Sequence, residues 1–451
     1  MNIIEIIEKK KYNQKLTKEE IDFFVNGVVD GDVADYQASA LLMAICINGM
    51  DYEETYNLTM AMTHSGDMLD LKDIGRAVLD KHSTGGVGDK TTLIVGPIMA
   101  ALGVPVGKMS GRGLGITGGT IDKLDTIPGF SSDVSTENFK NYLKTVGFVD
   151  AAQTLSLAPA DKILYALRDV TGTVDSIPLI SSSIMSKKLA SGAGSIVLDV
   201  KCGSGAFMND FDSAKLLAES MIETGKRAGK KMRAVITDMN EPLGYAVGNR
   251  LEVEEAVDFL KAVKQEPRLK RVVTVLCSEM YKLSDVYKGE SDEAVAYLIE
   301  EKINSGAAYA KFTEFVNMQG GSLDSFADND SYKENLINEG SLFKKELTAD
   351  DITTIESSGA YMYEDLSAAL FGNVSLRLGA GRLRKEDEID PDAGIVFVKK
   401  SFEKIMPGET LMTLYSRDFE RLNDAVAMVK DSLKLVSYDN ESDKDIILTI
   451  L

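Results

Sequence analysis

The chain of 451 residues has no tryptophan, only two histidines and only three cysteines. His64 and His82 are too few for a metal site built from several histidines. Cys46, Cys202 and Cys277 lie far apart and show no metal-ligand spacing. Scattered cysteines of this kind are typical of a reducing compartment, so we expect a cytoplasmic protein.

Long hydrophobic runs are also missing. No apolar run approaches the roughly 20 residues that a membrane-spanning helix needs. The first residues, MNIIEIIEKKKYNQ, lack the long apolar stretch and the small-residue cleavage site of a signal peptide. We therefore expect no membrane association.

Positive charge is in the minority. The chain has 50 Lys and Arg against 70 Asp and Glu, which gives a net charge of −20. A nucleic-acid-binding protein needs a broad basic face, so we expect no nucleic-acid partner. A small anionic ligand remains compatible with this charge, because a local pocket of Lys and Arg can capture it.

The length predicts two or three domains. The first 65 residues read as helices, with a capping box at Thr17 and Glu20 and an apolar stripe that follows it. From about residue 76, short β-branched runs alternate with Gly-rich turns and helical patterns, which predicts a largely parallel α/β sheet. In such sheets, ligands bind at the carboxyl ends of the strands.

Two later regions have a different pattern. The segment 160–191 is mostly helical, with a predicted break near Pro178, and it can return to the N-terminal helical unit. The polar stretch 320–335 reads as a loop or domain boundary. From about residue 345, strand-like runs such as DAGIVFVKK and GETLMTLYS predict an α+β subdomain.

The stretch KHSTGGVGDKTT (81–92) looks at first like a nucleotide P-loop. A P-loop that ends at Lys90 requires glycine at positions 84 and 89, where this chain has Thr84 and Asp89. Its glycines can still form a nest of N–H groups for an anion, next to a helix that starts near Thr91. The alternative is a tight strand-to-helix turn with a surface histidine at His82.

Three further segments carry polar residues in unusual patterns. KMSGRGLGITGGTIDKLD (108–125) contains a formal dinucleotide fingerprint, but no acidic residue follows where one would contact a ribose. Arg168, Ser183 and Lys187 can converge on one ligand, or they can form an ordinary solvated helix face. LDVKCGSGAFM (198–208) can be a small-residue loop that serves only close packing.

Taken together, these segments resemble the thymidine and pyrimidine nucleoside phosphorylase family. The resemblance also rests on ALRDVTGTVDSIPLISSSIMSKKLA, NEPLGYAVGNRLEVEEA, and the C-terminal GAGR and GIVFVKK. It covers nearly the whole chain and is strongest over 78–260. It implies a fold with a small all-α domain, a large α/β domain with a mixed sheet, and a C-terminal α+β subdomain. The corresponding ranges are 1–67 with 160–192, 70–158 with 193–335, and 336–451.

The resemblance also implies an activity. Such enzymes cleave the N-glycosidic bond of a pyrimidine nucleoside with inorganic phosphate, giving the base and a pentose 1-phosphate. They are homodimers whose domains close on the two substrates, and they use no organic cofactor. By position, the residues expected to hold phosphate are Lys81, Ser83, Thr92, Lys108, Ser110 and Thr120. Arg168, Ser183 and Lys187 would hold the base, with His82 beside it.

The chemistry of these residues suits that reaction. Negative charge moves onto the base as the bond breaks, and Arg168 and Lys187 would stabilise it. His82 would donate a proton or a hydrogen bond to a base carbonyl, or would only position the base. Lys108 resembles the branch that accepts uridine as well as thymidine. We therefore expect uridine, thymidine and deoxyuridine as substrates, with a thymidine-restricted enzyme as the alternative.

The chain departs from the family pattern at three positions. Ile116 stands where most members have His, and Asp125 where they have Glu. Lys90 stands where relatives have a Thr that helps to bind potassium. The other positions of that cation site match, and they are Gly88, Leu243, Ala246 and Glu255. We expect the Lys90 ammonium to replace the cation and to pair with Glu255, and the alternative is that Lys90 points to solvent beside a weak potassium site.

Two other functions are compatible with parts of the sequence. The first is a transferase like anthranilate phosphoribosyltransferase, which would need a diphosphate substrate and magnesium. The second is a catalytically silent binding protein, suggested by Ile116 and Asp125. The presence of His82, Arg168 and Lys187 argues against the second.

Overall fold

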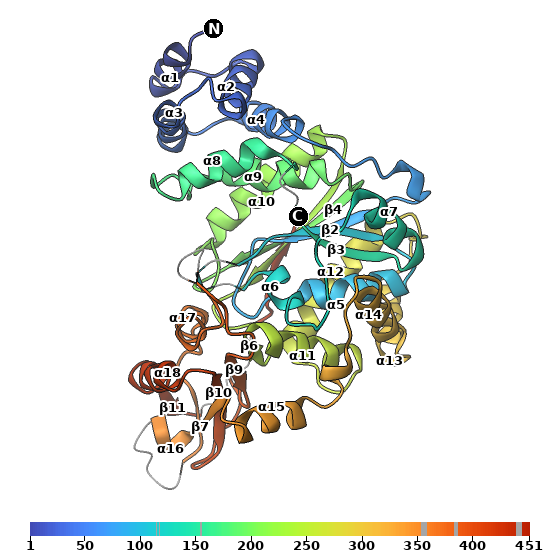
Figure 1. Ribbon diagram of the computed structural model, residues 1–451, viewed down its shortest axis with the longest axis vertical. Helices are drawn as coiled ribbons and strands as arrows, with labels where there is room; N and C mark the ends of the chain where they lie inside the picture. The colour runs from blue at the N-terminus through green and yellow to red at the C-terminus, as the bar shows by residue number, and fades with distance from the viewer. Residues whose placement is uncertain (114, 117, 154–155, 353–358, 383–386, 439–443) are drawn as a thin grey trace.

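The computed structural model describes residues 1–113, 115–116, 118–153, 156–352, 359–382, 387–438 and 444–451. The protein is elongated, with a helical domain at one end, an α/β domain in the middle and a C-terminal domain at the other end (Figure 1). The predicted fold class is confirmed. Among the helices of the described residues, none is both long and apolar enough to cross a membrane.

The helical domain contains the first four helices and two that follow much later in the chain. They are α1 (Ile3–Lys11), α2 (Lys18–Asp30), α3 (Asp35–Asn48), α4 (Tyr52–His64), α8 (Pro159–Arg168) and α9 (Ile177–Ala190). The predicted capping box is present, because Thr17 accepts from the Glu20 N–H and Glu20 accepts from the Thr17 N–H. The predicted break near Pro178 is confirmed, because the helical run is interrupted over 169–176 and α9 starts at Ile177. Pro178 lies in the first turn of α9, where it displaces no intrahelical hydrogen bond.

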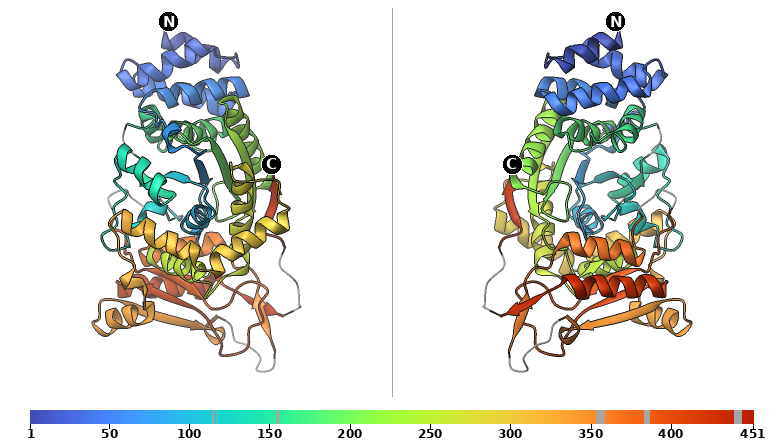
Figure 2. Two further views of the ribbon diagram at one scale, coloured as in Figure 1. Left: turned by 90° about the vertical axis from the view of Figure 1, so that its right-hand side faces the viewer. Right: turned by 90° about the vertical axis from the view of Figure 1, so that its left-hand side faces the viewer.

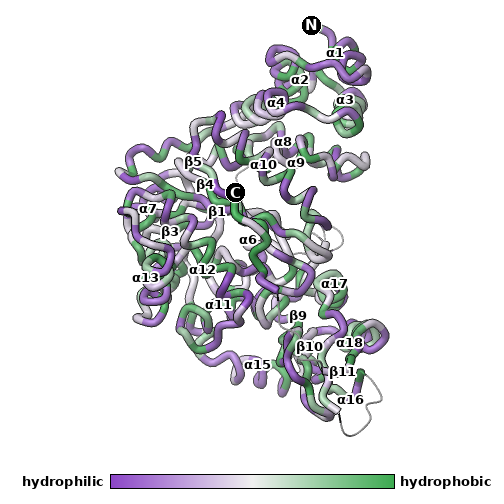
Figure 3. Tube along the Cα trace, turned by 180° about the vertical axis from the view of Figure 1, so that it is seen from behind, coloured by the Kyte–Doolittle hydropathy of each residue, from purple (hydrophilic) through white to green (hydrophobic). Residues whose placement is uncertain are grey.

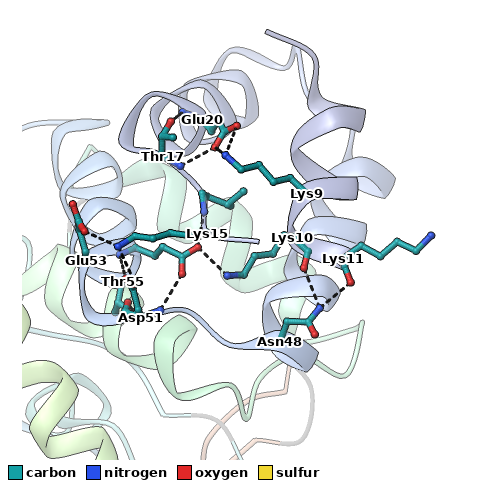
Figure 4. A network of polar contacts seen from close by, with 12 residues as sticks. Lys9, Lys10, Lys11, Lys15, Thr17, Glu20, Asn48, Asp51, Glu53 and Thr55 are labelled. Carbon is teal, nitrogen blue, oxygen red and sulfur yellow. Dashed lines mark hydrogen bonds and ion pairs between the residues drawn. The ribbon is translucent and has the colours of Figure 1, made fainter. Parts of the chain in front are cut away.

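Ion pairs tie the helices of this domain together (Figure 4). Lys10 pairs with Glu54 at 2.8 Å, and both side chains are buried. Lys15, between α1 and α2, pairs with Asp51 at 2.7 Å and Glu53 at 2.6 Å at the start of α4. These contacts fix the turn after α1 against α4.

The α/β domain is built on a sheet with the strand order β12-β5-β4-β1-β2-β3 in the described part of the chain. Its strands are β1 (Leu79–Ser83), β2 (Val106–Ser110), β3 (Phe148–Ala152), β4 (Ser195–Cys202), β5 (Lys231–Asp238) and β12 (Ile447–Ile450). β1 to β5 are parallel, and β12 pairs antiparallel with β5. The sheet is therefore mixed, and the last residues of the predicted range 336–451 lie in this domain.

Helices cover both faces of this sheet (Figures 1 and 2). They are α5 (Thr91–Ala101), α6 (Thr120–Leu124), α7 (Thr136–Thr145), α10 (Phe211–Arg227), α11 (Asn249–Leu260), α12 (Pro267–Leu283), α13 (Asp292–Asn304) and α14 (Ala307–Met318). α5 is apolar on all sides and nearly every residue in it is buried, so it forms the centre of the core. The short helices η1 (Lys72–Ile74) and η2 (Asp324–Phe326) lie in connections.

The C-terminal domain packs helices on a second sheet, with the strand order β6-β9-β10-β7. Its strands are β6 (Ala246–Val247), β7 (Phe343–Thr348), β9 (Gly394–Phe397) and β10 (Thr410–Ser416), and β8 (Tyr361–Tyr363) pairs with β11 (Leu435–Ser437). Its helices are α15 (Asn329–Asn338), α16 (Ala349–Ile352), α17 (Ala368–Leu378) and α18 (Phe419–Ser432). The expectation of a loop over 320–335 was wrong in its second half, since α15 begins at Asn329. This helix has no buried residue and is largely hydrophilic (Figure 3), so it gives no apolar stripe in the sequence.

Candidate active site

The ends of β1 and β2 bring four predicted residues side by side. The parallel register pairs Leu79 with Val106, so Lys81 and Lys108, and likewise Ser83 and Ser110, hold equivalent positions along the two strands. The Lys108 Nζ donates to the carbonyl oxygen of Lys81 at 2.8 Å. Two lysines and two hydroxyls thus meet at one strand edge, and this arrangement suits an anion.

Lys81 is buried and held from two sides. Its Nζ donates to Thr91 Oγ1 at 2.5 Å, at the start of α5, and lies 3.2 Å from the Asp199 carboxylate on β4. Asp199 also pairs with the fully buried Lys201 at 2.9 Å. Two ammonium groups therefore share the Asp199 carboxylate.

Asp89 is the acidic residue of the glycine loop, and sequence reasoning gave it no role in the site. It accepts hydrogen bonds from the hydroxyls of Ser83 and Thr91. Burial acts to raise its pKa, but the charges of Lys81 and Lys201 hold the pKa of Asp89 well below its ordinary value. Ser83 must turn away from this carboxylate before its hydroxyl can bind an anion.

Lys108 and Asp150 influence each other at the end of β2. Burial, together with the charge of Lys188, lowers the pKa of Lys108 to about 8. Burial raises the pKa of Asp150 to about 6, although Asp150 accepts from the Ser110 hydroxyl at 2.9 Å. An anion that binds at this edge, beside Asp150, would favour the charged form of Lys108.

His82 lies on β1 between Lys81 and Ser83. Its Nε2 atom is buried and has no hydrogen-bond partner among the described residues. Burial and the charges of Lys188, Lys108, Lys81 and Lys187 hold the pKa of His82 well below its ordinary value. The imidazole is therefore neutral near pH 7, so it can donate a hydrogen bond but carries no positive charge.

Arg168, Ser183 and Lys187 come together between α8 and α9. The Arg168 guanidinium is buried and donates to three backbone carbonyls, those of Thr173, Val174 and Leu179. The Lys187 Nζ lies 2.5 Å from Asp161 on α8 and 3.4 Å from Ser183 Oγ. The three residues form a polar cluster and not a solvated helix face, because Arg168 and Ser183 are buried and Lys187 is only 22% exposed.

Lys188 connects this cluster to the sheet, and sequence reasoning missed it. Its buried Nζ lies 2.9 Å from the Asp80 carboxylate on β1 and donates to the Met109 carbonyl on β2 at 3.2 Å. α9 is thereby anchored one residue before Lys81 and one residue after Lys108. The only signal in the sequence was the doubled lysine in SKK.

The two remaining predicted phosphate residues lie at the starts of helices. Thr92 is in the first turn of α5 and is buried, and Thr120 is the first residue of α6. Both helices begin at the edge of the sheet where β1 and β2 end. All six predicted residues therefore surround the same sheet edge.

Comparisons with known proteins agree with this geometry. Three family models match: the helical bundle domain of a glycosyl transferase family over residues 4–66, its a/b domain over 75–309, and the pyrimidine nucleoside phosphorylase C-terminal domain over 362–436. The pyrimidine-nucleoside phosphorylase of Geobacillus stearothermophilus is 46% identical over 435 residues, 96% of each chain. That of Staphylococcus aureus (strain MSSA476) is 47% identical over 445 residues, 97% of each chain.

The chain belongs to the pyrimidine-nucleoside phosphorylase family. It is thus an enzyme of the pentosyltransferase class. A solved structure, anthranilate phosphoribosyltransferase from Thermus thermophilus, matches with a TM-score of 0.56 and 19% identity, over 69% of this chain and 98% of that chain. This likeness shows a shared fold.

Lys90 is the residue that departs most from the phosphorylase family pattern. Its Nζ donates to the carbonyl oxygens of Leu243 at 2.7 Å and Ala246 at 2.9 Å, and to Glu255 Oε2 at 2.8 Å. The alternative that Lys90 points to solvent is wrong, because this side chain is fully buried. Three predicted cation ligands already bind a positive charge, so the site does not fit a potassium ion.

Proposed function

We propose that this enzyme catalyses the reversible phosphorolysis of uridine, thymidine and deoxyuridine, giving the free base and ribose or deoxyribose 1-phosphate. One observation carries the proposal. Lys188, next to Lys187 on α9, lies 2.9 Å from Asp80 and donates to the Met109 carbonyl, so α9 is anchored beside Lys81 and Lys108. The expected phosphate and base residues therefore lie next to each other, with His82 between Lys81 and Ser83 on β1.

The residues have distinct roles in this proposal. Lys81, Lys108 and the hydroxyls of Ser83, Ser110, Thr92 and Thr120 bind inorganic phosphate beneath C1′ of the sugar. As the glycosidic bond lengthens, positive charge develops on the sugar and negative charge on the base. Phosphate stabilises the positive charge on the sugar and attacks C1′ with inversion. Arg168 and Lys187 stabilise the negative charge on the base. Neutral His82 donates a hydrogen bond to a base carbonyl, and no protein nucleophile takes part.

Two features bear on the competing functions. Lys108 supports the broader substrate range over a thymidine-restricted one, through its resemblance to enzymes that accept uridine. The fold shared with anthranilate phosphoribosyltransferase favours a transferase of that kind only at the level of architecture. The match to the pyrimidine nucleoside phosphorylase C-terminal domain favours the phosphorylase.

Base release tests the proposal directly. When inorganic phosphate is present, incubation with uridine, thymidine or deoxyuridine should release uracil or thymine. Chromatography measures the released base. Omission of phosphate should abolish release, and chelation of magnesium should leave it unchanged. Release of thymine alone would support the thymidine-restricted enzyme, and no release from any nucleoside would contradict the proposal.

We also propose that the Lys90 ammonium takes the place of the monovalent cation that relatives bind. An ammonium brings one positive charge and three donors, which matches two carbonyls and one carboxylate. Glu255 also accepts from the N–H groups of Tyr245 at 2.7 Å and Ala246 at 2.8 Å. Lys90 therefore ties the glycine loop to α11 without a bound ion.

A homodimer formed through the helical domain completes the proposal. Large apolar side chains are exposed on α1 and α3, among them Ile4, Tyr36 and Ile47. These helices lie at the free end of the molecule (Figure 1). Exposed large apolar side chains on one domain favour association through it.

The mass in solution tests the dimer. Light scattering after gel filtration should give twice the chain mass, and Ile47→Glu should weaken the dimer at least about tenfold because a charge is buried in the interface. Val398, exposed on the C-terminal domain, gives the matched control Val398→Glu, which should remain dimeric. A dimer unaffected by Ile47→Glu would place the interface elsewhere.

A further inference from the structure

Asp122, on α6, joins three parts of the phosphate side of the site. Its carboxylate accepts the N–H of Gly113 at 2.6 Å and the Arg112 Nη1 at 3.1 Å, both from the loop after β2. It also forms an ion pair with Arg382 Nη2. The Asp122 side chain is only 3% exposed, so these partners decide where the carboxylate lies.

Arg382 reaches this point from the C-terminal domain, 260 residues further along the chain. It ends the sequence GAGR that follows α17, and its carbonyl oxygen accepts the N–H of Gly115 at 3.1 Å. Two residues earlier, the Ala380 carbonyl accepts from the side chain of Asn249 on α11 at 2.8 Å. One short segment of the C-terminal domain thus binds the loop through both its side chain and its backbone.

Ile116 adds an apolar contact between the same loop and the C-terminal domain. It packs with Val87 and the residues of α17 in the core of the C-terminal domain. Gly372 on α17 leaves no spare room, because a Cβ there would lie 2.9 Å from Ile116 Cβ and 3.0 Å from Val87 Cγ2. Ile116 therefore joins the loop between β2 and α6 to α17 and to the glycine loop after β1.

We propose that Arg382 is a positioning residue for inorganic phosphate, acting through Asp122. This inference rests on the proposed phosphate site. Ser110 and Thr120 flank the loop that Asp122 closes, so the carboxylate sets the distance between these two hydroxyls. Arg382 also neutralises Asp122. Without this partner, the negative charge of the buried carboxylate beside the site would repel phosphate. Arg112 cannot replace it fully, since its side chain is 52% exposed whereas that of Arg382 is 14% exposed.

The test is Arg382→Gln, with phosphate affinity measured apart from catalysis. Isothermal titration with inorganic phosphate should show Kd raised about 10- to 100-fold, because small displacements of binding groups are costly. The value of kcat/KM for phosphate should fall by the same factor. At saturating phosphate, kcat/KM for uridine should stay within about twofold. Arg382→Lys, which keeps the charge but loses the planar fork, should recover part of the affinity.

Arg377 on α17 provides the matched control. It pairs with Asp424 in the same domain, and both side chains are about half exposed. Arg377→Gln removes the same charge and should leave both Kd and kcat/KM unchanged. If Arg382→Gln does not fold, a second variant is Gly372→Ala. It displaces Ile116, which contacts the C-terminal domain from the same loop, and it should also weaken the binding of phosphate more than that of uridine.

Each outcome is decisive. If the phosphate Kd of Arg382→Gln is within twofold of the wild-type value, Arg382 serves only stability. The same follows if kcat/KM falls equally for phosphate and for uridine. Wild-type protein that binds phosphate but releases no base would contradict the proposed reaction, while the Kd comparison would still decide the role of Arg382. Wild-type protein that binds no phosphate would contradict both.

Discussion

Replacing Arg168 by alanine should lower kcat/KM for phosphorolysis of uridine by about 10³-fold. The guanidinium is buried between α8 and α9, where water is excluded and a charge acts strongly on a developing anion. Lys187→Ala should have an effect of similar size, because it removes the second positive charge beside the base. The loss should appear mainly in kcat, since both groups act on charge that develops as the bond breaks. Base release under steady-state conditions measures it.

The control must separate chemistry from folding. Arg168 donates to three backbone carbonyls, so its removal also loosens the connection between α8 and α9. The melting temperature of each variant therefore has to be measured beside its activity. Lys162→Ala removes an exposed charge from the same helix and should leave kcat/KM unchanged. Full activity in both Arg168→Ala and Lys187→Ala would show that the base binds elsewhere.

Replacing Lys90 by threonine should create a potassium requirement that the wild type lacks. In potassium-free buffer, the free energy of unfolding should fall by about 3 kcal/mol, because the buried carboxylate of Glu255 loses its partner. The smaller side chain leaves space among the carbonyls of Leu243 and Ala246. Potassium bound there should restore stability, by roughly 1.4 kcal/mol at a concentration tenfold above its Kd. Denaturant titrations with potassium or tetramethylammonium chloride measure the difference.

Two comparisons sharpen this result. Wild-type stability should be the same in both salts, because the Lys90 ammonium already binds the three oxygens. Lys90→Met removes the charge but fills the space, so it should lose stability without recovering it in potassium. A wild-type protein that is stabilised specifically by potassium would contradict the proposed replacement.

The parts of the site that depend on local sequence were predictable. The predicted parallel strands end in glycine loops at one sheet edge, and the family resemblance supplied Lys81, Ser83, Lys108 and Ser110 as the residues there. The pairing of Leu79 with Val106 places the two strands side by side. The side chain of Lys90 also lies where a family comparison put it. The strand ends follow from local pairing, whereas the contact of Lys90 with Glu255 spans 165 residues and was predicted only through the family resemblance.

Contacts between distant segments were not predictable where the family resemblance gave no pattern for them. Asp122 and Arg382 are 260 residues apart, and neither has a neighbour in sequence that signals the pair. Lys188 differs from Lys187 only by a turn of about 100° on the same helix, yet it binds Asp80 on the sheet and Lys187 binds Asp161. The helix α15 has no buried face, so hydrophobic periodicity could not reveal it.

The strand β12 has a consequence for the order in which the protein forms. Just after β12, the N–H and carbonyl of Leu451 bond to Ala234 on β5 at 2.8 and 3.0 Å. The edge of β5 therefore stays uncovered on the ribosome until β12 has been synthesised. Open strand edges promote pairing with other chains. The nascent protein thus carries this hazard throughout synthesis of its C-terminal domain, until β12 pairs with β5.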